Sequence, residues 1–348
     1  MSKDLFLPHI RNIEGYIPGE QPRAGEYIKL NTNENPYPPS PNVIVAVRNA
    51  CNSQLRRYPD PDAYSVVVRL SKLFGISENQ IVVGNGSDEL LNVALRCFAG
   101  TGQRVALPFP TYPYYQKLIE LQNAVAQRFD LDENFSIPED FPPTDANLSL
   151  LANPNSPTGT AIDSRSVGRM ATQTQGVLLV DEAYVDFSDV GCIDLIEHHS
   201  NLLVLRTMSK SFSLAAMRIG FCFGHPDLIS GLRKVIDHYN VNALSQIAAS
   251  TALDEIDYMK SNVVRIRATR ERLEKALKAL GFYVWDSNAN FVLARIESPP
   301  AAELHRILKE RCILVRYFNE VRLENCLRIS VGTDIENDRL IKELTDII

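Results

Sequence analysis

The chain has 348 residues, of which 45% are hydrophobic and 22% charged, and its formal net charge is −6. These values are typical of a soluble globular protein long enough for one or two domains, and the acidic balance argues against non-specific binding to nucleic acid or anionic membranes. No stretch approaches 18 consecutive apolar residues and the N-terminus has no signal-peptide pattern, so we expect a cytoplasmic protein without nucleic-acid or membrane partners.

The cysteines and histidines form no metal-binding pattern. None of the six cysteines forms a C-x-x-C pair, and most lie in apolar stretches, which is typical of free thiols in a reducing compartment. The pair His198 and His199 lacks further ligands at metal-site spacing. We therefore expect no metal.

From about residue 65 to residue 224, stretches typical of strands alternate with stretches typical of helices. Residues 1–40 are polar and proline-rich and predict an extended arm. After this arm come short apolar strands, and the segments between them have apolar residues at helical spacing. Strands of this kind are usually covered on both faces, as in a mostly parallel sheet. The expected strands are 81–84, 104–108, 124–129, 148–153, 176–181, 201–207 and 219–224.

The pattern changes after about residue 240. One helix is expected over 243–257 and a long charged one over 260–280, ending at Gly281, and short strands and helices follow to the C-terminus. Short strands with helices packed on them predict a smaller α+β domain. We expect residues 1–40 to be an arm that joins this domain, 41–240 to be the large domain, and 241–348 to be the small one.

The stretch VGNGSDELL, residues 83–91, follows a strand and opens a helix. Gly84 and Gly86 permit close backbone approach, Ser87 supplies a hydroxyl, and the helix N-terminus supplies free N–H donors, which together fit an anion such as phosphate. The same residues also fit an ordinary capped helix, in which the negative charges of Asp88 and Glu89 interact favourably with the positive end of the helix dipole. The stretch alone leaves both interpretations open.

Two further strands end in residues that carry chemistry. Asp181 ends an apolar strand, at the edge of the sheet where α/β proteins bind ligands, and it needs a cation or hydrogen bonds there. Lys210 follows another such strand, and a lysine partly desolvated there is a nucleophilic amine for an aldehyde. Thr207, Ser209 and Arg218 then suit a phosphate on the same cofactor, and Asp181 suits its protonated ring nitrogen.

These residues resemble the fold-type I aminotransferases that use pyridoxal phosphate, and among them most closely the histidinol-phosphate aminotransferases. The resemblance covers nearly the whole chain. Its motifs, in order, are YIPGEQP, KLNTNENPYPPSP, RRYPDP, GNGSDELL, PTYPYY, NPNSPTG, DEAYVDF, RTMSKSFSLAAMRIGF and LRISVGT. It implies an α/β fold with a large, mostly parallel sheet between helices and a smaller α+β domain.

The resemblance also implies roles for individual residues. Lys210 would hold the cofactor as a Schiff base and then move the proton at the substrate's α-carbon, Asp181 would keep the ring nitrogen protonated, and Tyr184 would bond the ring 3-oxygen. Tyr58 would reach the cofactor phosphate of the neighbouring subunit, which requires a homodimer with shared active sites. The remaining residues would hold the cofactor (Gly86, Ser87, Asp88, Tyr112, Asn155, Ser156, Thr207, Ser209, Arg218) or the substrate (Tyr16, Asn35, Arg316, Arg328).

One position departs from the family's pattern. Before P-T-G the family usually has an asparagine that contacts the ring 3-oxygen, and here that position is Ser156, with Asn155 one place earlier. The serine hydroxyl could fill this role, or Tyr184 could carry it alone. The sequence leaves open which of them does so.

The resemblance implies a reaction between a small-molecule amino donor and a 2-oxo acid. The expected pair is L-histidinol phosphate and 2-oxoglutarate, giving imidazole-acetol phosphate and L-glutamate in histidine biosynthesis. Arg316 and Arg328 could accept either a phosphate or a carboxylate. The alternatives are an aromatic aminotransferase, a phosphothreonine decarboxylase of the same fold, and a regulatory domain that binds the cofactor without turnover.

Overall fold

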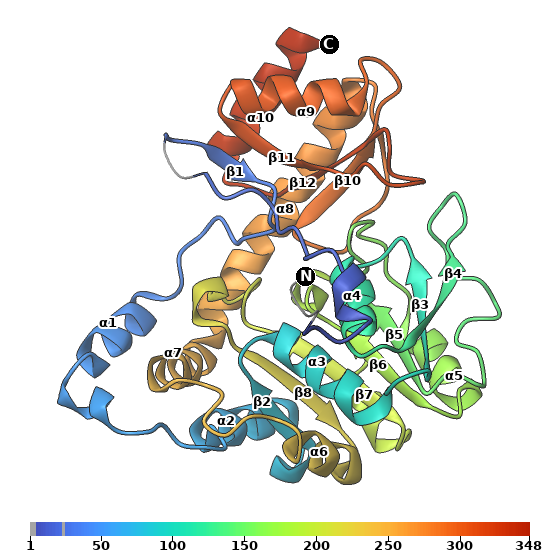
Figure 1. Ribbon diagram of the computed structural model, residues 1–348. Coiled ribbons are helices and arrows are strands. Elements are labelled where there is room, and N and C mark those ends of the chain that lie inside the picture. Colours follow the sequence, from blue (N-terminus) through green and yellow to red (C-terminus); the bar gives the residue numbers. More distant parts are fainter. Residues whose placement is uncertain (1–4, 23–24) are drawn as a thin grey trace.

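The computed structural model describes residues 5–22 and 25–348, and its two β-sheets carry helices on their faces (Figure 1). Parts of the predicted N-terminal arm, residues 1–4 and 23–24, lie outside the described residues. Among the residues that are described, no helix combines the length and the apolar character that crossing a membrane requires.

The larger sheet has seven strands, six of which run in one direction. β8 alone runs opposite to its neighbours, because it pairs antiparallel with both β2 and β7. Every residue of β5 and β6 is buried, as their continuous apolar sequences predict. In sheet order the strands are β2 (Ile81–Gly84), β8 (Gly220–Gly224), β7 (Leu202–Thr207), β6 (Val177–Asp181), β5 (Leu148–Ala152), β3 (Arg104–Phe109) and β4 (Val125–Asp130).

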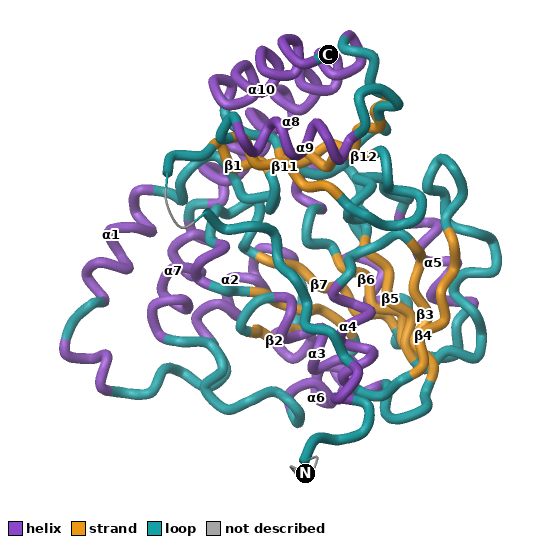
Figure 2. The backbone as a smooth tube through the Cα atoms, turned by 45° about the horizontal axis from the view of Figure 1, so that its top comes forward, coloured by secondary structure: helices purple, strands orange, loops and turns teal. Residues whose placement is uncertain are grey.

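Helices cover both faces of this sheet (Figure 2), and each layer of helices shares a separate apolar core with the sheet. One face carries α3 (Ser87–Phe98), α4 (Tyr114–Leu121) and α6 (Pro226–Arg233). The other face carries α2 (Tyr64–Phe74), α5 (Ser164–Gln173) and α7 (Ala243–Asp254), and α1 (Pro41–Ala50) packs against α7.

The smaller sheet has five strands and lies beside the N-terminal segment of the chain. β1 pairs in parallel with β11, and the other pairings are antiparallel. The strands, in sheet order, are β1 (Ile28–Leu30), β11 (Ile313–Tyr317), β12 (Cys326–Ser330), β10 (Phe291–Arg295) and β9 (Tyr283–Val284). α9 (Ala301–Glu310), α10 (Asp334–Ile347) and the end of the long α8 (Ile256–Ala279) pack on it.

The start of α8 packs against the larger sheet and its end against the smaller one, so this helix connects the two. One helix had been expected over 243–257, whereas α7 ends at Asp254 and α8 begins at Ile256. Glu255 interrupts them with a non-helical backbone, and its carboxylate accepts hydrogen bonds from Ser40 and Asn42 at the start of α1.

The expected fold class is confirmed: a mostly parallel sheet lies between helices, with a smaller sheet and its own helices beside it. Pairing of β1 with β11 brings the N-terminal segment to the smaller sheet. The domain boundaries at residues 40 and 240 stay predictions.

Candidate active site

A pocket of about 370 Å³ opens where the parallel strands of the larger sheet end. Asp181 ends β6 and Thr207 ends β7, and neighbouring parallel strands bring such ends to one edge. Two short N-terminal stretches, 16–19 and 31–33, and the strands β11 and β12 of the smaller sheet close it from the other side. Of the predicted residues, the pocket is lined by Tyr16, Ser87, Asp88, Tyr112, Ser156, Asp181, Tyr184, Thr207, Ser209, Lys210, Arg218, Arg316 and Arg328.

Lys210 reaches this pocket from a loop that is held on several sides. Its Nζ donates to the carbonyl of Thr32 at 3.3 Å and lies 5.5 Å from the centre of the Tyr184 ring. The Asn35 amide donates to the carbonyls of Lys210 and Ser211, at 3.0 Å each. Asn35 was predicted to bind substrate, but it does not line the pocket, and its contacts fix the backbone of the lysine loop instead.

Asp181 is a buried carboxylate that faces the same space. The Tyr115 hydroxyl donates to its Oδ2 at 2.8 Å, and the backbone N–H of Ala183 donates to its Oδ1 at 3.1 Å. Burial raises the pKa of the Asp181 carboxyl to about 6, and these two hydrogen bonds only partly oppose that rise. A cation placed in the pocket beside Asp181 would therefore stabilise its ionised form.

The N-terminus of α3 forms an anion site with the end of β7. Ser87 and Asp88, whose N–H groups belong to the first turn of the helix, line the pocket together with Thr207 and Ser209. The hydroxyls of Thr207 and Ser209 lie 3.0 Å apart, and Arg218 Nη1 is 3.5 Å from Ser209 Oγ. Gly86 has a φ of 88°, and a Cβ there would lie 2.7 Å from Arg218 Nη2. The position therefore requires glycine.

Asp88 and Tyr112 border this anion site. Asp88 pairs with Arg218 at 2.9 Å between Oδ2 and Nη2, and its Oδ1 accepts from the Tyr112 hydroxyl at 3.3 Å. The Tyr112 ring meets the Tyr115 ring edge to face, with centroids 5.4 Å apart, and burial raises the pKa of the Tyr112 hydroxyl. Tyr16 lies 6.4 Å from Tyr112 between ring centroids, so an aromatic cluster forms one wall of the pocket.

Arg316 and Arg328 face each other across β11 and β12. Arg328 donates to Ser156 Oγ at 3.2 Å and to the carbonyl of Asn31 at 2.9 Å, while its Nε has no partner in the part of the chain that the structure describes. Within residues 5–22 and 25–348, no carboxylate pairs with either guanidinium. Burial lowers the pKa of Arg328, so an incoming anion would relieve an uncompensated charge.

Ser156 and Asn155 face opposite sides of the segment that follows β5. The Asn155 amide donates to the carbonyl of Pro110 and to Thr158 Oγ1, and its Oδ1 accepts from Thr111. These bonds occupy the whole amide, which lies outside the pocket of Lys210. The resemblance gave Asn155 a cofactor contact, whereas the geometry brings Ser156 to the pocket.

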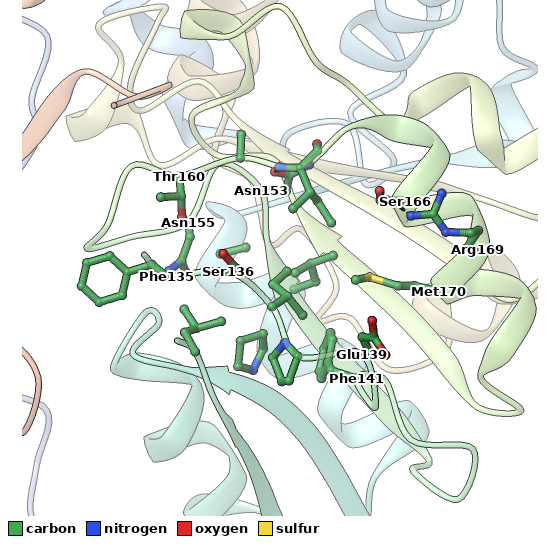
Figure 3. A pocket seen from close by; sticks show the side chains of 18 of the residues that line it. Phe135, Ser136, Glu139, Phe141, Asn153, Asn155, Thr160, Ser166, Arg169 and Met170 are labelled. Carbon is green, nitrogen blue, oxygen red and sulfur yellow. Dashed lines mark hydrogen bonds between the residues drawn. The ribbon is translucent and has the colours of Figure 1, made fainter. Parts of the chain in front are cut away.

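Asn155 instead lines a second, larger pocket of about 640 Å³ (Figure 3). This pocket lies between α5 and the segment 131–141, and Arg169 and Glu139 are its charged residues. Neither Lys210 nor Asp181 lines it, so the larger pocket lacks the groups that the predicted chemistry needs.

Tyr58 lies apart from the pocket of its own chain. Its side chain is 80% exposed and stacks on Tyr239, with ring centroids 4.5 Å apart. Such a position fits a residue that acts outside its own subunit.

Sequence reasoning missed three residues that shape the site. Tyr115 supports Asp181, Asn33 bonds the hydroxyl of Tyr184 at 3.0 Å, and Thr32 receives the Lys210 amine. Tyr115 belongs to the quoted motif PTYPYY and lies in the first turn of α4, but nothing in that motif indicates its contact with Asp181. Asn33 and Thr32 lie in the quoted motif KLNTNENPYPPSP, but nothing in that motif indicates their distant partners.

Comparison with known proteins decides the family. Residues 25–344 match the family model described as aminotransferase class I and II. The chain belongs to this aminotransferase family. Among its curated relatives, the histidinol-phosphate aminotransferase 1 of a Nostoc species is 41% identical over 99% of this chain and 98% of its own. The histidinol-phosphate aminotransferase of a Geobacter species is 42% identical over 97% of both chains.

The solved structures agree in fold. The crystal structure of histidinol-phosphate aminotransferase from Sinorhizobium meliloti, in complex with pyridoxal 5'-phosphate, matches with a TM-score of 0.91 and 24% identity, covering 99% of this chain and 98% of that one. An L-threonine-O-3-phosphate decarboxylase from Porphyromonas gingivalis matches with a TM-score of 0.82 and 22% identity, over 92% and 98% of the two chains. At these identities the likeness shows the fold alone.

Aminotransferases of this family depend on pyridoxal 5'-phosphate, and this chain is a pyridoxal-phosphate-dependent aminotransferase that acts on small molecules. The pocket fits that cofactor. Lys210 supplies an amine for its aldehyde, Asp181 an acceptor for its ring nitrogen, and the N-terminus of α3 with Arg218 a cradle for its phosphate.

Proposed function

We propose that this aminotransferase exchanges an amino group between L-histidinol phosphate and 2-oxoglutarate, giving imidazole-acetol phosphate and L-glutamate. The names of the Nostoc and Geobacter relatives support this substrate pair, because both match nearly the whole chain at above 40% identity. A role in histidine biosynthesis follows from that reaction.

The observation that carries the proposal is a pair of arginines to which no carboxylate of the described residues is paired. Arg316 and Arg328 lie on neighbouring strands and both line the pocket of Lys210. Two guanidinium groups at one place can bind the phosphate of histidinol phosphate in one half-reaction and the carboxylate of glutamate in the other. Tyr16, on the same wall, offers its ring to the imidazole.

The bound cofactor supplies an aldehyde and an electron-withdrawing ring. Lys210 would hold the aldehyde carbon and would act as the base and acid for the proton at the substrate's α-carbon. Asp181 keeps a proton on the ring nitrogen, since its own burial favours pairing with a cation. Ser87, Thr207, Ser209 and Arg218 bind the phosphate and fix the ring in register with Lys210.

Two hydroxyls suit the ring 3-oxygen. Arg328 donates to Ser156 Oγ, and a guanidinium accepts no hydrogen bond, so the Ser156 proton is free to donate into the pocket. Tyr184 lines the pocket as well. We therefore assign the contact to Tyr184 and Ser156, and to Asn155 only an indirect role through Thr111 and Pro110.

A homodimer with shared active sites completes the proposal. Tyr58 is exposed and stacks on Tyr239, so its hydroxyl is free to reach the phosphate site of a second subunit. Exposed apolar side chains on α1 and the turn after it, Ile44, Val45 and Leu55, offer surface for such contact. A place in the cytoplasm stays a prediction from the sequence.

The test is a half-reaction followed by absorbance. Purified protein loaded with pyridoxal phosphate is mixed separately with L-histidinol phosphate, L-glutamate, L-phenylalanine and O-phospho-L-threonine, and conversion of the cofactor to its amine form is recorded. Rapid conversion by histidinol phosphate and glutamate, with phenylalanine slow, is the expected result.

Two outcomes would contradict the proposal. Conversion by phenylalanine but not by histidinol phosphate would assign the chain to the aromatic aminotransferases. Release of carbon dioxide from O-phosphothreonine would assign it to the decarboxylases, whose fold it shares.

A further inference from the structure

The hydroxyl of Tyr184 has one hydrogen-bond partner among the residues that the structure describes, and that partner is Asn33. The Asn33 side-chain nitrogen donates to it at 3.0 Å. Asn33 is 1% exposed, has a φ of 55°, and lies between β1 and α1. Its contacts reach 151 residues along the chain to Tyr184 and 297 residues to Ser330.

Ser330 fixes which way the Asn33 amide points. The Ser330 oxygen accepts the backbone N–H of Asn33 at 2.8 Å, and the single Ser330 proton goes to Asn33 Oδ1 at 3.0 Å. The amide oxygen therefore faces Ser330 and the amide nitrogen faces Tyr184. Asn290 also holds this residue, since its amide donates to the Asn33 carbonyl at 3.0 Å.

This orientation decides where the Tyr184 proton points. An amide nitrogen donates and does not accept, so the hydroxyl oxygen is the acceptor toward Asn33 and its proton is left free. Tyr184 lines the pocket of Lys210, and its ring meets the Phe291 ring edge to face. Since Asn33 donates to the hydroxyl oxygen, the free proton is available for donation to a group bound in the pocket that Tyr184 lines.

We propose that Asn33 is a positioning residue for transamination, which holds the Tyr184 proton toward the pocket so that it donates to the 3-oxygen of the cofactor. The inference rests on the role proposed above for Tyr184. The Asn33 donor also polarises the tyrosine hydroxyl, which strengthens the hydrogen bond that this hydroxyl donates in turn.

The hydrogen bond from Asn33 to Tyr184 matters in this chain because Ser156 occupies the position where the family usually has an asparagine. An asparagine there would bring a second amide donor directly to the 3-oxygen, whereas Ser156 offers only a rotatable hydroxyl. In this chain the amide of Asn33 acts on the 3-oxygen indirectly, by orienting and polarising the Tyr184 hydroxyl. Ser330 and Asn290 belong to the region of the smaller sheet, and Tyr184 belongs to that of the larger sheet. The hydrogen bond from Asn33 to Tyr184 therefore also depends on how the two regions pack together.

The test measures the pH midpoint of the absorbance change of the lysine-bound cofactor. Negative charge on the 3-oxygen favours the protonated imine, and a hydrogen bond donated to that oxygen reduces this effect, so loss of the donor raises the midpoint. The variants are Tyr184→Phe, Asn33→Gly and Asn33→Asp, together with the double variant N33D/Y184F. Glycine tolerates the positive φ of Asn33, and aspartate keeps the bond from Ser330.

We expect Tyr184→Phe to raise the midpoint by about one to two pH units, in proportion to a hydrogen bond with a charged group. Asn33→Asp should give a similar rise, because a carboxylate accepts the Tyr184 proton and turns it away from the pocket. Asn33→Gly should give a smaller rise, because the proton is then free to rotate. The double variant should match Tyr184→Phe alone, whereas a pure charge effect of the aspartate would persist without the hydroxyl.

The control is Asn201→Asp, which makes the same exchange at a partly buried amide bonded to backbone carbonyls before β7, at the end of the strand opposite Thr207. It should leave the midpoint unchanged. A shift in Tyr184→Phe with none in either Asn33 variant would overturn the role of Asn33 alone. No shift in Tyr184→Phe would overturn the proposed tyrosine contact and the inference with it.

Discussion

At the scale of single residues, Asp181 combines burial with a need to be ionised. Its carboxyl lies at the end of β6, accepts from Tyr115 and Ala183, and still has a pKa raised to about 6 from a usual 3.8. An acid whose folded pKa is raised binds more protons in the folded state, so its contribution to stability is lost as pH rises through this range. Cofactor-free protein therefore carries an electrostatic cost at neutral pH that a cationic ring would relieve.

Asp181→Asn should remove this cost. We expect the free energy of unfolding of the cofactor-free variant, relative to wild type, to increase by about 3 kcal/mol between about pH 4 and pH 7, which is the free-energy equivalent of the shift. Urea unfolding of both proteins at several pH values measures the difference.

The control is Asp189→Asn. Arg267 lowers the pKa of this exposed carboxyl, so its removal should give a pH trend of the opposite sign. A flat difference between wild type and Asp181→Asn across the pH range would contradict the burial argument. Asp181→Asn should also lose affinity for pyridoxal phosphate, because the amide of the introduced asparagine cannot neutralise the ring cation.

At the scale of elements, the phosphate cradle depends on how closely β8 approaches the start of α3. A Cβ on Gly220 would lie 2.6 Å from the carbonyl carbon of Gly86 and would also collide with the backbone nitrogen of Ser87. Both neighbours are backbone atoms, so the loop itself would have to move. The donors at the helix N-terminus would move with it.

Gly220→Ala should therefore destabilise the protein by about 1 to 3 kcal/mol and weaken binding of pyridoxal phosphate by about tenfold or more. Gly231→Ala is the matched control, because Gly231 lies inside α6 with nothing within 4 Å of an added Cβ. That change should stabilise the helix slightly. Thermal melts and cofactor titration compare the two, and equal cofactor affinity in Gly220→Ala and wild type would contradict the argument.

The elements were largely predictable from the sequence, and the contacts between them were not. Continuous apolar runs predicted buried strands such as β5 and β6. Asp181 at the end of one strand and Lys210 in the loop after another lie together because parallel strands end at one edge. The break between α7 and α8 was predicted a few residues too late, between 257 and 260, because Glu255 bonds to Ser40 and Asn42, more than 200 residues away. The position of Asn33 against Tyr184 has no local signal for the same reason.

At the scale of the whole molecule, the proposed dimer makes each pocket depend on two chains. Lys210 lines the pocket of its own chain, whereas Tyr58 lies outside it with 80% of its side chain exposed. If Tyr58 serves the phosphate of the partner subunit, the two residues of one active site come from different chains. Subunits with different defects should then complement each other.

Mixed dimers of a Lys210→Ala chain and a Tyr58→Phe chain test this arrangement. The Lys210→Ala dimer should bind the cofactor without a Schiff base and without transamination, and the Tyr58→Phe dimer should lose about tenfold or more in cofactor affinity, as expected for one hydrogen bond to a charged group. In the mixed dimer, one site combines an intact Lys210 with an intact Tyr58 of the partner subunit. That site should bind cofactor with wild-type affinity and give about half the wild-type activity per dimer.

The outcome distinguishes the two positions for Tyr58 because each chain carries only one defect. If Tyr58 acted within its own chain, every site of the mixed dimer would lack either the lysine or the tyrosine. Cofactor titration and activity at limiting cofactor would then stay at the level of the Tyr58→Phe protein, with half as many competent sites. Recovery of wild-type affinity at one site per dimer requires that the phosphate of one subunit is bound by the tyrosine of the other.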